Sequence, residues 1–248
     1  MEKEFRNEDY FDFKKLSIDE RFIKINTNNC TYIFEVCKEA AYNNKHIGLI
    51  VEPGYGTQSA IRDFIKLMPN VKYYFEVCTA SKGLRKTLVD FLQLELPPFI
   101  NVNQSSEDYL VNALSYYFNN INSKRKRLIA LHNFENYSGI KNYGIVQKLS
   151  EKLKDTSGMV ITLNERKFNQ LTNISEKRSD IQKFLLAFDW RLIPPPSPQE
   201  LGTYCVARGV LGKIIIDKLI KDTSDFRTLN KKINNIKELS IKRGYIKP

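Results

Sequence analysis

The stretch HIGLIVEPGYGTQSAIRDFI, residues 46–65, decides the fold of this chain. The apolar run at residues 47–51 predicts a buried strand, and residues 52–56 supply the proline and glycines of a tight turn. Apolar residues then recur at helical spacing over residues 57–68. A strand, a glycine-rich turn and a helix in this order form a frame whose backbone N–H groups and helix N-terminus can hold an anion.

The side chains that do phosphate chemistry are missing from this frame. In the Walker A pattern G-x-x-x-x-G-K-[ST], the four specified positions fall on Val51, Gly56, Thr57 and Gln58, so only Gly56 is kept. In an active site the lysine binds the phosphates and the next hydroxyl binds Mg²⁺. Neutral Thr57 and the amide of Gln58 supply neither group. The sequence therefore predicts a kept frame with lost chemistry.

Composition bounds the class of protein. The chain has 248 residues, of which 42% are hydrophobic and 27% charged, as is ordinary for a folded protein. No apolar run is long enough for a transmembrane helix, and the charged N-terminus is not a signal peptide, so we expect a cytoplasmic protein without membrane contact. The net charge of +11 favours nucleic acid as a partner. A lysine-rich composition from an AT-rich genome is the alternative, and the sequence leaves both open.

Metal sites and disulfides are not expected. The four cysteines, at positions 30, 37, 78 and 205, form no C-x-x-C pair and have apolar surroundings, which is typical of buried thiols in a reducing compartment. Only His46 and His132 are available as imidazole ligands. We therefore predict no metal centre and no histidine-based triad.

Strands alternate with helices along residues 46–193. Further strands are predicted at residues 71–77, 128–131, 158–163 and 190–193, and helices at 31–42, 81–94, 106–121, 143–153 and 175–188. This alternation favours an α/β fold with a mainly parallel five-stranded sheet covered on both faces. The proline run at 194–198 ends the core, and helices follow at 200–206, 211–220 and 226–241. We predict N-terminal arm and helices at 1–45, a core at 46–193 and a helical subdomain at 194–248.

Several positions together resemble one superfamily. Pro53-Gly54-Tyr55-Gly56-Thr57-Gln58 aligns with its phosphate loop, and the strand at 128–131 followed by His132 and Asn133 aligns with its Walker B segment. Asn164 falls at the sensor-1 position, Arg191 in the arginine-finger region and Arg227 in the sensor-2 region. The chain thus resembles the AAA+ ATPases, and more closely the DNA-transposition helpers of the Mu B and TnsC type. The resemblance implies a P-loop NTPase-like fold with a C-terminal helical lid.

The departures from that family bear on activity. His132 and Asn133 replace both Walker B carboxylates, and Glu135 lies two residues past the usual position, so rescue from there needs a register shift. The resemblance therefore implies a degenerate AAA+ protein without hydrolysis and without catalytic residues, which requires no cofactor or holds ATP or ADP without turnover. It would act as a scaffold or regulator with DNA or AAA+ subunits. An ATPase with a non-standard loop, or a pure protein-interaction module, are the alternatives.

A basic run precedes the third predicted strand. Lys124, Arg125, Lys126 and Arg127 are candidates for non-specific DNA contacts, and a solvated loop is the other interpretation. The scattered lysines of the C-terminal helices have the same two interpretations. His132 follows a buried strand, so we expect a hydrogen-bonded, partly buried side chain there rather than a catalytic base.

Overall fold

The computed structural model describes residues 10–17, 27–97, 100–120, 126–137 and 139–243. Their contacts divide the chain into two compact units, and each is described by itself. The α/β unit comprises residues 32–52 and 57–193, and the helical unit comprises residues 1–31, 53–56 and 194–248. The division into three segments that the sequence predicts, with limits at residues 45 and 193, stays a prediction.

A parallel five-stranded sheet forms the centre of the α/β unit, in the order β2-β3-β4-β1-β5. Its strands are β1 (His46–Ile50), β2 (Val71–Val77), β3 (Lys126–His132), β4 (Gly158–Leu163) and β5 (Asp189–Leu192). The strand register pairs Leu49 with Thr162 and with Arg191, and Val77 with His132. The predicted parallel sheet is confirmed.

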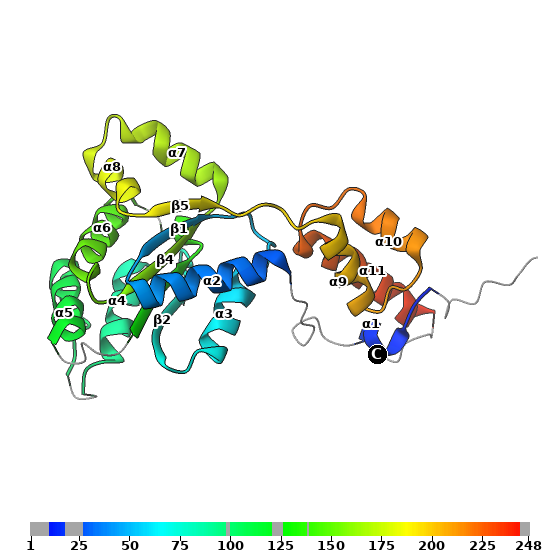
Figure 1. The fold of residues 1–248 in the computed structure, drawn as a ribbon, viewed down its shortest axis with the longest axis horizontal. Coiled ribbons are helices and arrows are strands. Elements are labelled where there is room, and N and C mark those ends of the chain that lie inside the picture. The colour runs from blue at the N-terminus through cyan, green and yellow to red at the C-terminus, as the bar shows by residue number, and fades with distance from the viewer. Residues whose placement is uncertain (1–9, 18–26, 98–99, 121–125, 138, 244–248) are drawn as a thin grey trace, which may run out of the picture. The chain divides into compact units, whose positions relative to one another are not determined.

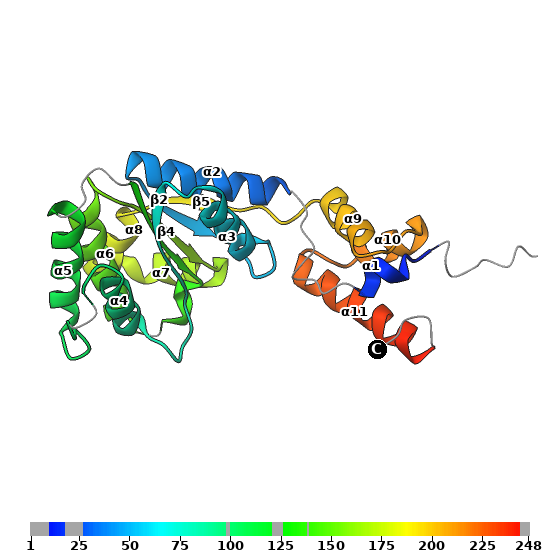
Figure 2. The ribbon, with the colours of Figure 1, turned by 90° about the horizontal axis from the view of Figure 1, so that it is seen from below.

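Helices cover both faces of this sheet (Figures 1 and 2). They are α2 (Asn28–Asn43), α3 (Thr57–Leu67), α4 (Leu84–Gln93), α5 (Glu107–Asn120), α6 (Lys141–Leu153), α7 (Glu165–Ser175) and α8 (Ser179–Leu186). Successive strand side chains point to opposite faces, so Ile129 and Leu131 pack against α4–α8, while Leu128 and Ala130 are buried on the other face. On that second face Phe34 of α2 meets Phe64 of α3, with ring centroids 5.2 Å apart.

One predicted helix is wrong in its extent. The sequence predicted a single helix over residues 175–188, but the structure has α7 and α8 on either side of a turn at residues 176–178. Asn164 begins α7, since its side chain accepts a hydrogen bond from the backbone of Lys167. In α7 Leu171 is buried and Phe168 is partly buried against the core, while most other side chains of this short helix are polar.

The helical unit has its own small core. Its helices are α1 (Phe13–Ser17), α9 (Pro198–Ala207), α10 (Lys213–Ile220) and α11 (Phe226–Lys242). Their shared core consists of Leu16, Leu201, Tyr204, Cys205, Val210, Leu229 and Ile233. Ser197 and Glu200 form a capping box at the start of α9, which fixes the point where the proline run becomes a helix.

Candidate functional site

The carboxyl ends of β1, β3 and β4 meet at one edge of the sheet, as parallel strands require. Glu52 follows β1, His132 ends β3, and Asn164 follows β4. In open parallel sheets this edge is where ligands bind. The carboxyl edge of the sheet is therefore the place in the α/β unit where a ligand site is expected.

His132 and Asn133 form a polar link between β3 and β4. His132 is buried, and its Nδ1 shares a hydrogen bond with Thr162 Oγ1 at 2.9 Å. The backbone N–H of Asn133 donates to the same hydroxyl at 2.8 Å. The expectation of a buried, hydrogen-bonded histidine is confirmed. An imidazole and an amide thus stand where the superfamily that the motifs resemble has carboxylates.

The chain turns sharply after this link and brings Glu135 back to the edge. Asn133 adopts a left-handed backbone conformation, with φ +58°, and the 3₁₀ turn η3 (Phe134–Asn136) follows. As a result Asn164 Nδ2 donates to Glu135 Oε1 at 3.0 Å. The second carboxylate oxygen, Oε2, is buried without a hydrogen-bond partner among the described residues. The structure thus joins two predicted site residues that are 29 positions apart in the sequence.

The surroundings of Glu135 shift its pKa upward. Burial raises the pKa of Glu135 above its ordinary value, the hydrogen bonds from Asn164 and the local backbone oppose this, and the charge of Glu52 adds to the rise. Glu52 itself accepts a hydrogen bond from the backbone N–H of Glu165 at 3.0 Å, at the start of α7. Two acidic side chains therefore lie near this edge. Sequence reasoning singled out Glu135 but overlooked Glu52, which it treated only as part of the turn.

Thr57 and Gln58 begin α3 at the positions of the missing lysine and hydroxyl. Thr57 is 4% exposed, and its Oγ1 has no hydrogen-bond partner among the described residues. Gln58 is half-buried. A buried hydroxyl without a partner is costly unless a ligand or water satisfies it. Neither side chain can supply a positive charge to a phosphate.

The loop at residues 53–56 belongs to the helical unit. Gly54 has φ +97° and Gly56 has φ +84°, which favour glycine at both positions. The backbone N–H of Phe226 donates to Gly54 O at 3.1 Å. A Cβ atom added at Gly54 would lie 2.5 Å from Asp225 Oδ1 and 3.1 Å from Arg227 Cβ. Sensor-2-like Arg227 is therefore placed beside this loop, together with the acidic N-cap of α11.

Arginine-finger-like Arg191 is engaged in ion pairs within the α/β unit. Its Nη1 lies 2.7 Å from Glu39 Oε2, and its Nη2 lies 2.6 Å from Asp189 Oδ2. The Arg191 guanidinium, and after it Lys45, lower the pKa of Glu39 to about 2. Both neighbouring acids neutralise the arginine, so it is not free to reach another ligand in this arrangement.

The basic run before β3 needs a correction. Lys124 and Arg125 lie outside the described residues, and the Lys126 ammonium donates to Tyr42 O at 2.9 Å. Arg127 is 1% exposed, donates to Phe118 O at 3.0 Å, and lies over the Phe118 ring. The interpretation of Arg127 as a surface contact for DNA is wrong, because its guanidinium is a core group at the start of a buried strand.

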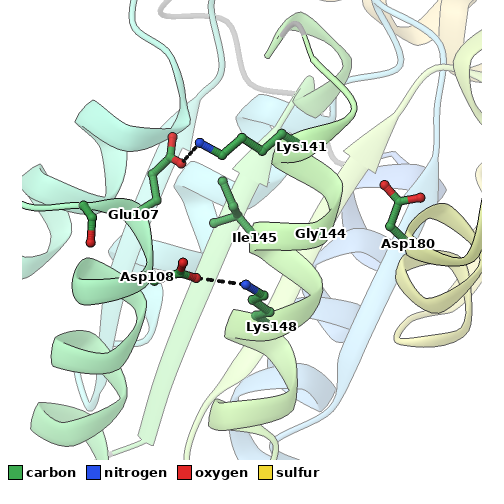
Figure 3. A pocket seen from close by; sticks show the side chains of 8 residues that line it. Glu107, Asp108, Lys141, Gly144, Ile145, Lys148 and Asp180 are labelled. Carbon is green, nitrogen blue, oxygen red and sulfur yellow. Dashed lines mark hydrogen bonds and ion pairs between the residues drawn. The ribbon is translucent and has the colours of Figure 1, made fainter.

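A separate charged hollow of about 340 Å³ lies between α5, α6 and Asp180 of α8 (Figure 3). Lys141 pairs with Glu107, and Lys148 pairs with Asp108 at 2.9 Å. Each lysine of the lining already faces an acid, so the hollow offers no unpaired lysine to an anionic ligand. Within the described part of the chain, no three His, Cys, Asp or Glu side chains group as metal ligands would. None of the described helices is long and apolar enough to cross a membrane.

Comparison with known proteins gives matches of structure alone. No protein family and no curated protein matches the sequence. The structure is similar to Cdc6p from Pyrobaculum aerophilum, with TM-score 0.65 and 11% identity over 95% of this chain and 67% of that one. It is also similar to the Aeropyrum pernix ORC2 protein, with TM-score 0.61 and 15% identity over 95% and 69%.

A third similar structure is the replication initiator DnaA bound to AMPPCP and single-stranded DNA, with TM-score 0.54 and 14% identity over 91% of this chain and 67% of that one. Identities this low support a shared fold and nothing finer. The strand order, the loop after β1 and the helical region after β5 agree with that fold. The chain therefore has the α/β fold of the AAA+ P-loop ATPases, with a C-terminal helical region.

Proposed function

We propose that this chain is a degenerate AAA+ protein that does not hydrolyse ATP and acts as a DNA-binding or oligomeric scaffold or regulator. The observation that carries this proposal is the residue type at four positions: Thr57, Gln58, His132 and Asn133 stand where phosphoryl transfer needs a lysine, a Mg²⁺ ligand and two carboxylates. Transposition and mobile-element systems with helpers of the Mu B and TnsC type are the setting that the motif resemblance favours.

The magnitude of the loss supports the absence of turnover. Removing one preorganised contact to a transition state costs about 2.7–4 kcal/mol. Four such contacts are changed here, and even with strong non-additivity the remaining frame would give negligible hydrolysis. Backbone N–H groups and the N-terminus of α3 remain, so ATP or ADP bound without turnover is compatible with the proposal.

DNA and AAA+ subunits are the proposed partners, in the cytoplasm. The net charge of +11 supports DNA, and the similar DnaA structure is bound to single-stranded DNA. A hetero-oligomer with a catalytically intact subunit would give Arg191 a role toward the neighbour's nucleotide, once it leaves Glu39.

Equilibrium binding of fluorescent ATP and ADP, with and without Mg²⁺, tests the nucleotide part together with a turnover assay. We expect no turnover. Micromolar binding without turnover would make the nucleotide a structural or regulatory ligand, and no binding at millimolar levels would leave the fold as a scaffold alone. ATP turnover by the purified wild-type chain would overturn the proposal if a substitution in this chain abolishes it, because the activity then belongs to the chain itself.

A conventional ATPase with a non-standard loop is the second candidate, and the contact between Glu135 and Asn164 favours it. This contact places a carboxylate beside the sensor-1-like amide in spite of the two-residue offset in the sequence. Under this alternative Glu135 would orient the attacking water. ATP turnover that Glu135→Gln removes, while nucleotide affinity is unchanged, would decide for it. Equal turnover in both proteins would eliminate it.

A further inference from the structure

Positive charge is concentrated in the helical unit. Residues 194–243 carry ten Lys or Arg and five Asp or Glu, a net +5 in 50 residues. Residues 46–193 carry twenty and fourteen, a net +6 in 148 residues. In the α/β unit many cations face acids, as Lys82, Lys141 and Lys148 do. Residues 194–243, the C-terminal segment of the helical unit, therefore have the higher density of net positive charge.

Some cations of this unit serve its own fold. Lys232 donates to Leu219 O and Thr223 Oγ1, Lys237 donates to Ser17 O, and the buried Arg208 donates to Asn234 Oδ1. These groups are engaged by the helices and loops around them. They are not available to a partner without a loss of internal contacts.

The exposed cations of α11 are different. The side chains of Arg227, Lys231 and Lys242 are exposed and make no hydrogen bond or ion pair with any described residue. Their spacings of 4 and 11 residues place them within about 60° of arc on one side of the helix, over about 22 Å of its length. The opposite side of α11 is buried through Leu229 and Ile233. We call the exposed arc with Arg227, Lys231 and Lys242 the α11 basic face.

The chemistry of the α11 basic face fits a polyanionic rod better than a protein surface. Duplex DNA carries one negative charge per about 1.7 Å of its axis, so a row of cations some 22 Å long meets phosphates along its whole length. Protein interfaces depend on buried aromatic or apolar anchors, and this arc has no aromatic side chain. Glu238 is the acidic exception: it is exposed, and in the helical projection it lies between Arg227 and Lys231.

We propose that the α11 basic face is the surface through which the chain binds the phosphate backbone of double-stranded DNA, without sequence specificity. This inference rests on the DNA half of the proposed function and assigns it to one surface. Lysine contacts to phosphates position a protein on DNA but carry no base information. Release of counterions makes such binding strongly dependent on salt.

The test is fluorescence anisotropy of a labelled duplex of mixed sequence, titrated with the full chain at about 50 and 200 mM salt. Lys231→Gln with Lys242→Gln removes two contacts and should lower the slope of log K against log salt by about 1.8, so the variant loses about 12-fold less affinity over this range. Gln has nearly the helix propensity of Lys, so α11 should be kept. Circular dichroism of the variant checks this.

Two further variants separate this surface from net charge alone. Lys152→Gln with Lys183→Gln removes the same charge from exposed, unpaired helix positions of the α/β unit, and should leave the slope unchanged. Glu238→Gln should tighten binding, a gain that structural damage cannot mimic. Equal effects of the two double variants, or no gain from Glu238→Gln, would overturn the assignment to α11 while DNA binding itself stands.

Two other results also count against the assignment. If the wild-type chain binds no duplex at the lower salt concentration, both this inference and the DNA half of the proposed function fail. If only a single-stranded probe responds to the Lys231 and Lys242 changes, the assignment to duplex DNA is wrong. The variants show whether the surface is wrong, the wild-type titration shows whether DNA binding is absent, and the single-stranded probe shows whether duplex DNA is the wrong ligand.

Discussion

The ion pair between Glu39 and Arg191 ties α2 to the edge strand β5, and its removal has a calculable effect. Two contacts form it, at 2.7 Å and 3.1 Å, between side chains that are 28% and 23% exposed. Glu39→Gln keeps the shape of the side chain but removes its charge. Arg191 then keeps only Asp189 as a counter-charge, so we expect the variant to be less stable than the wild type near neutral pH.

The magnitude follows from the pKa of Glu39, which Arg191 and Lys45 lower from 4.5 to about 2. A shift of this size, undiminished, corresponds to about 3.4 kcal/mol. Both side chains are about a quarter exposed, and solvent screens such pairs, so we expect about 1–2 kcal/mol. Because the folded-state pKa is the lower one, this stabilisation is present above about pH 4.5 and is lost as the pH falls toward 2.

Urea unfolding at about pH 7 and pH 3 measures the effect, followed by the fluorescence of Trp190, the single tryptophan, which lies next to Arg191 in β5. At pH 3 less than about half of the difference between the proteins should remain. Glu35→Gln is the matched control on the same helix, because its pair with Lys38 is about half exposed and should contribute under about 0.5 kcal/mol. An equal loss at both pH values, or an equal loss in the control, would refute an electrostatic origin.

Three further substitutions test the carboxyl edge of the sheet and the packing of the helices on it. Glu135→Gln should stabilise the chain at about pH 8 and leave its stability unchanged near pH 4. Burial raises the folded-state pKa above 4.5, so ionisation of the wild-type carboxyl costs stability as the pH rises. Thermal unfolding measures this, and a difference in melting temperature between the two proteins that does not change with pH would contradict the reasoning. Gly158→Ala should lower the free energy of unfolding by about 3 kcal/mol, since the new Cβ would lie 2.1 Å from the backbone oxygen of Ala40. Gly144→Ala in α6 meets no atom within 4 Å and should raise it by about 0.5–1 kcal/mol. The melting temperatures of the two variants should therefore shift in opposite directions from that of the wild type.

The sheet could be predicted from the sequence because its strands are short apolar runs between turn signals. Residues 71–77 and 158–163 were predicted with the bounds that the structure gives to β2 and β4. The helix α7 was missed although Phe168, Leu171 and Ile174 recur at helical spacing, because these three apolar residues stand among polar ones and only Leu171 is fully buried. The signal that could have found it is Asn164, which the motif comparison used as a sensor residue but which also has the side chain of a helix N-cap.

Arg127 shows where composition misleads. In the sequence it is one of four adjacent cations, and a run of like charges is typical of a solvated segment. In the structure its side chain is buried at the start of β3. The guanidinium donates a hydrogen bond to the Phe118 carbonyl oxygen and lies over the Phe118 ring. Burial of an arginine depends on partners from a helix that precedes it by several residues, and no local pattern encodes that contact.

The position of Glu135 bears on both candidate functions, the scaffold without hydrolysis and the ATPase with a non-standard loop. Counted along the sequence, it lies past the Walker B position, but Asn133 at φ +58° and the following 3₁₀ turn bring it to Asn164. Burial of this carboxylate raises its pKa, so the ionised form is kept at a cost in stability at neutral pH. A scaffold without nucleotide chemistry gains nothing from that cost, whereas an ATPase needs the charge beside its sensor. Glu135→Gln therefore separates the two candidates: a gain in stability with unchanged nucleotide and DNA binding supports the scaffold, and a gain in stability with loss of turnover supports the enzyme.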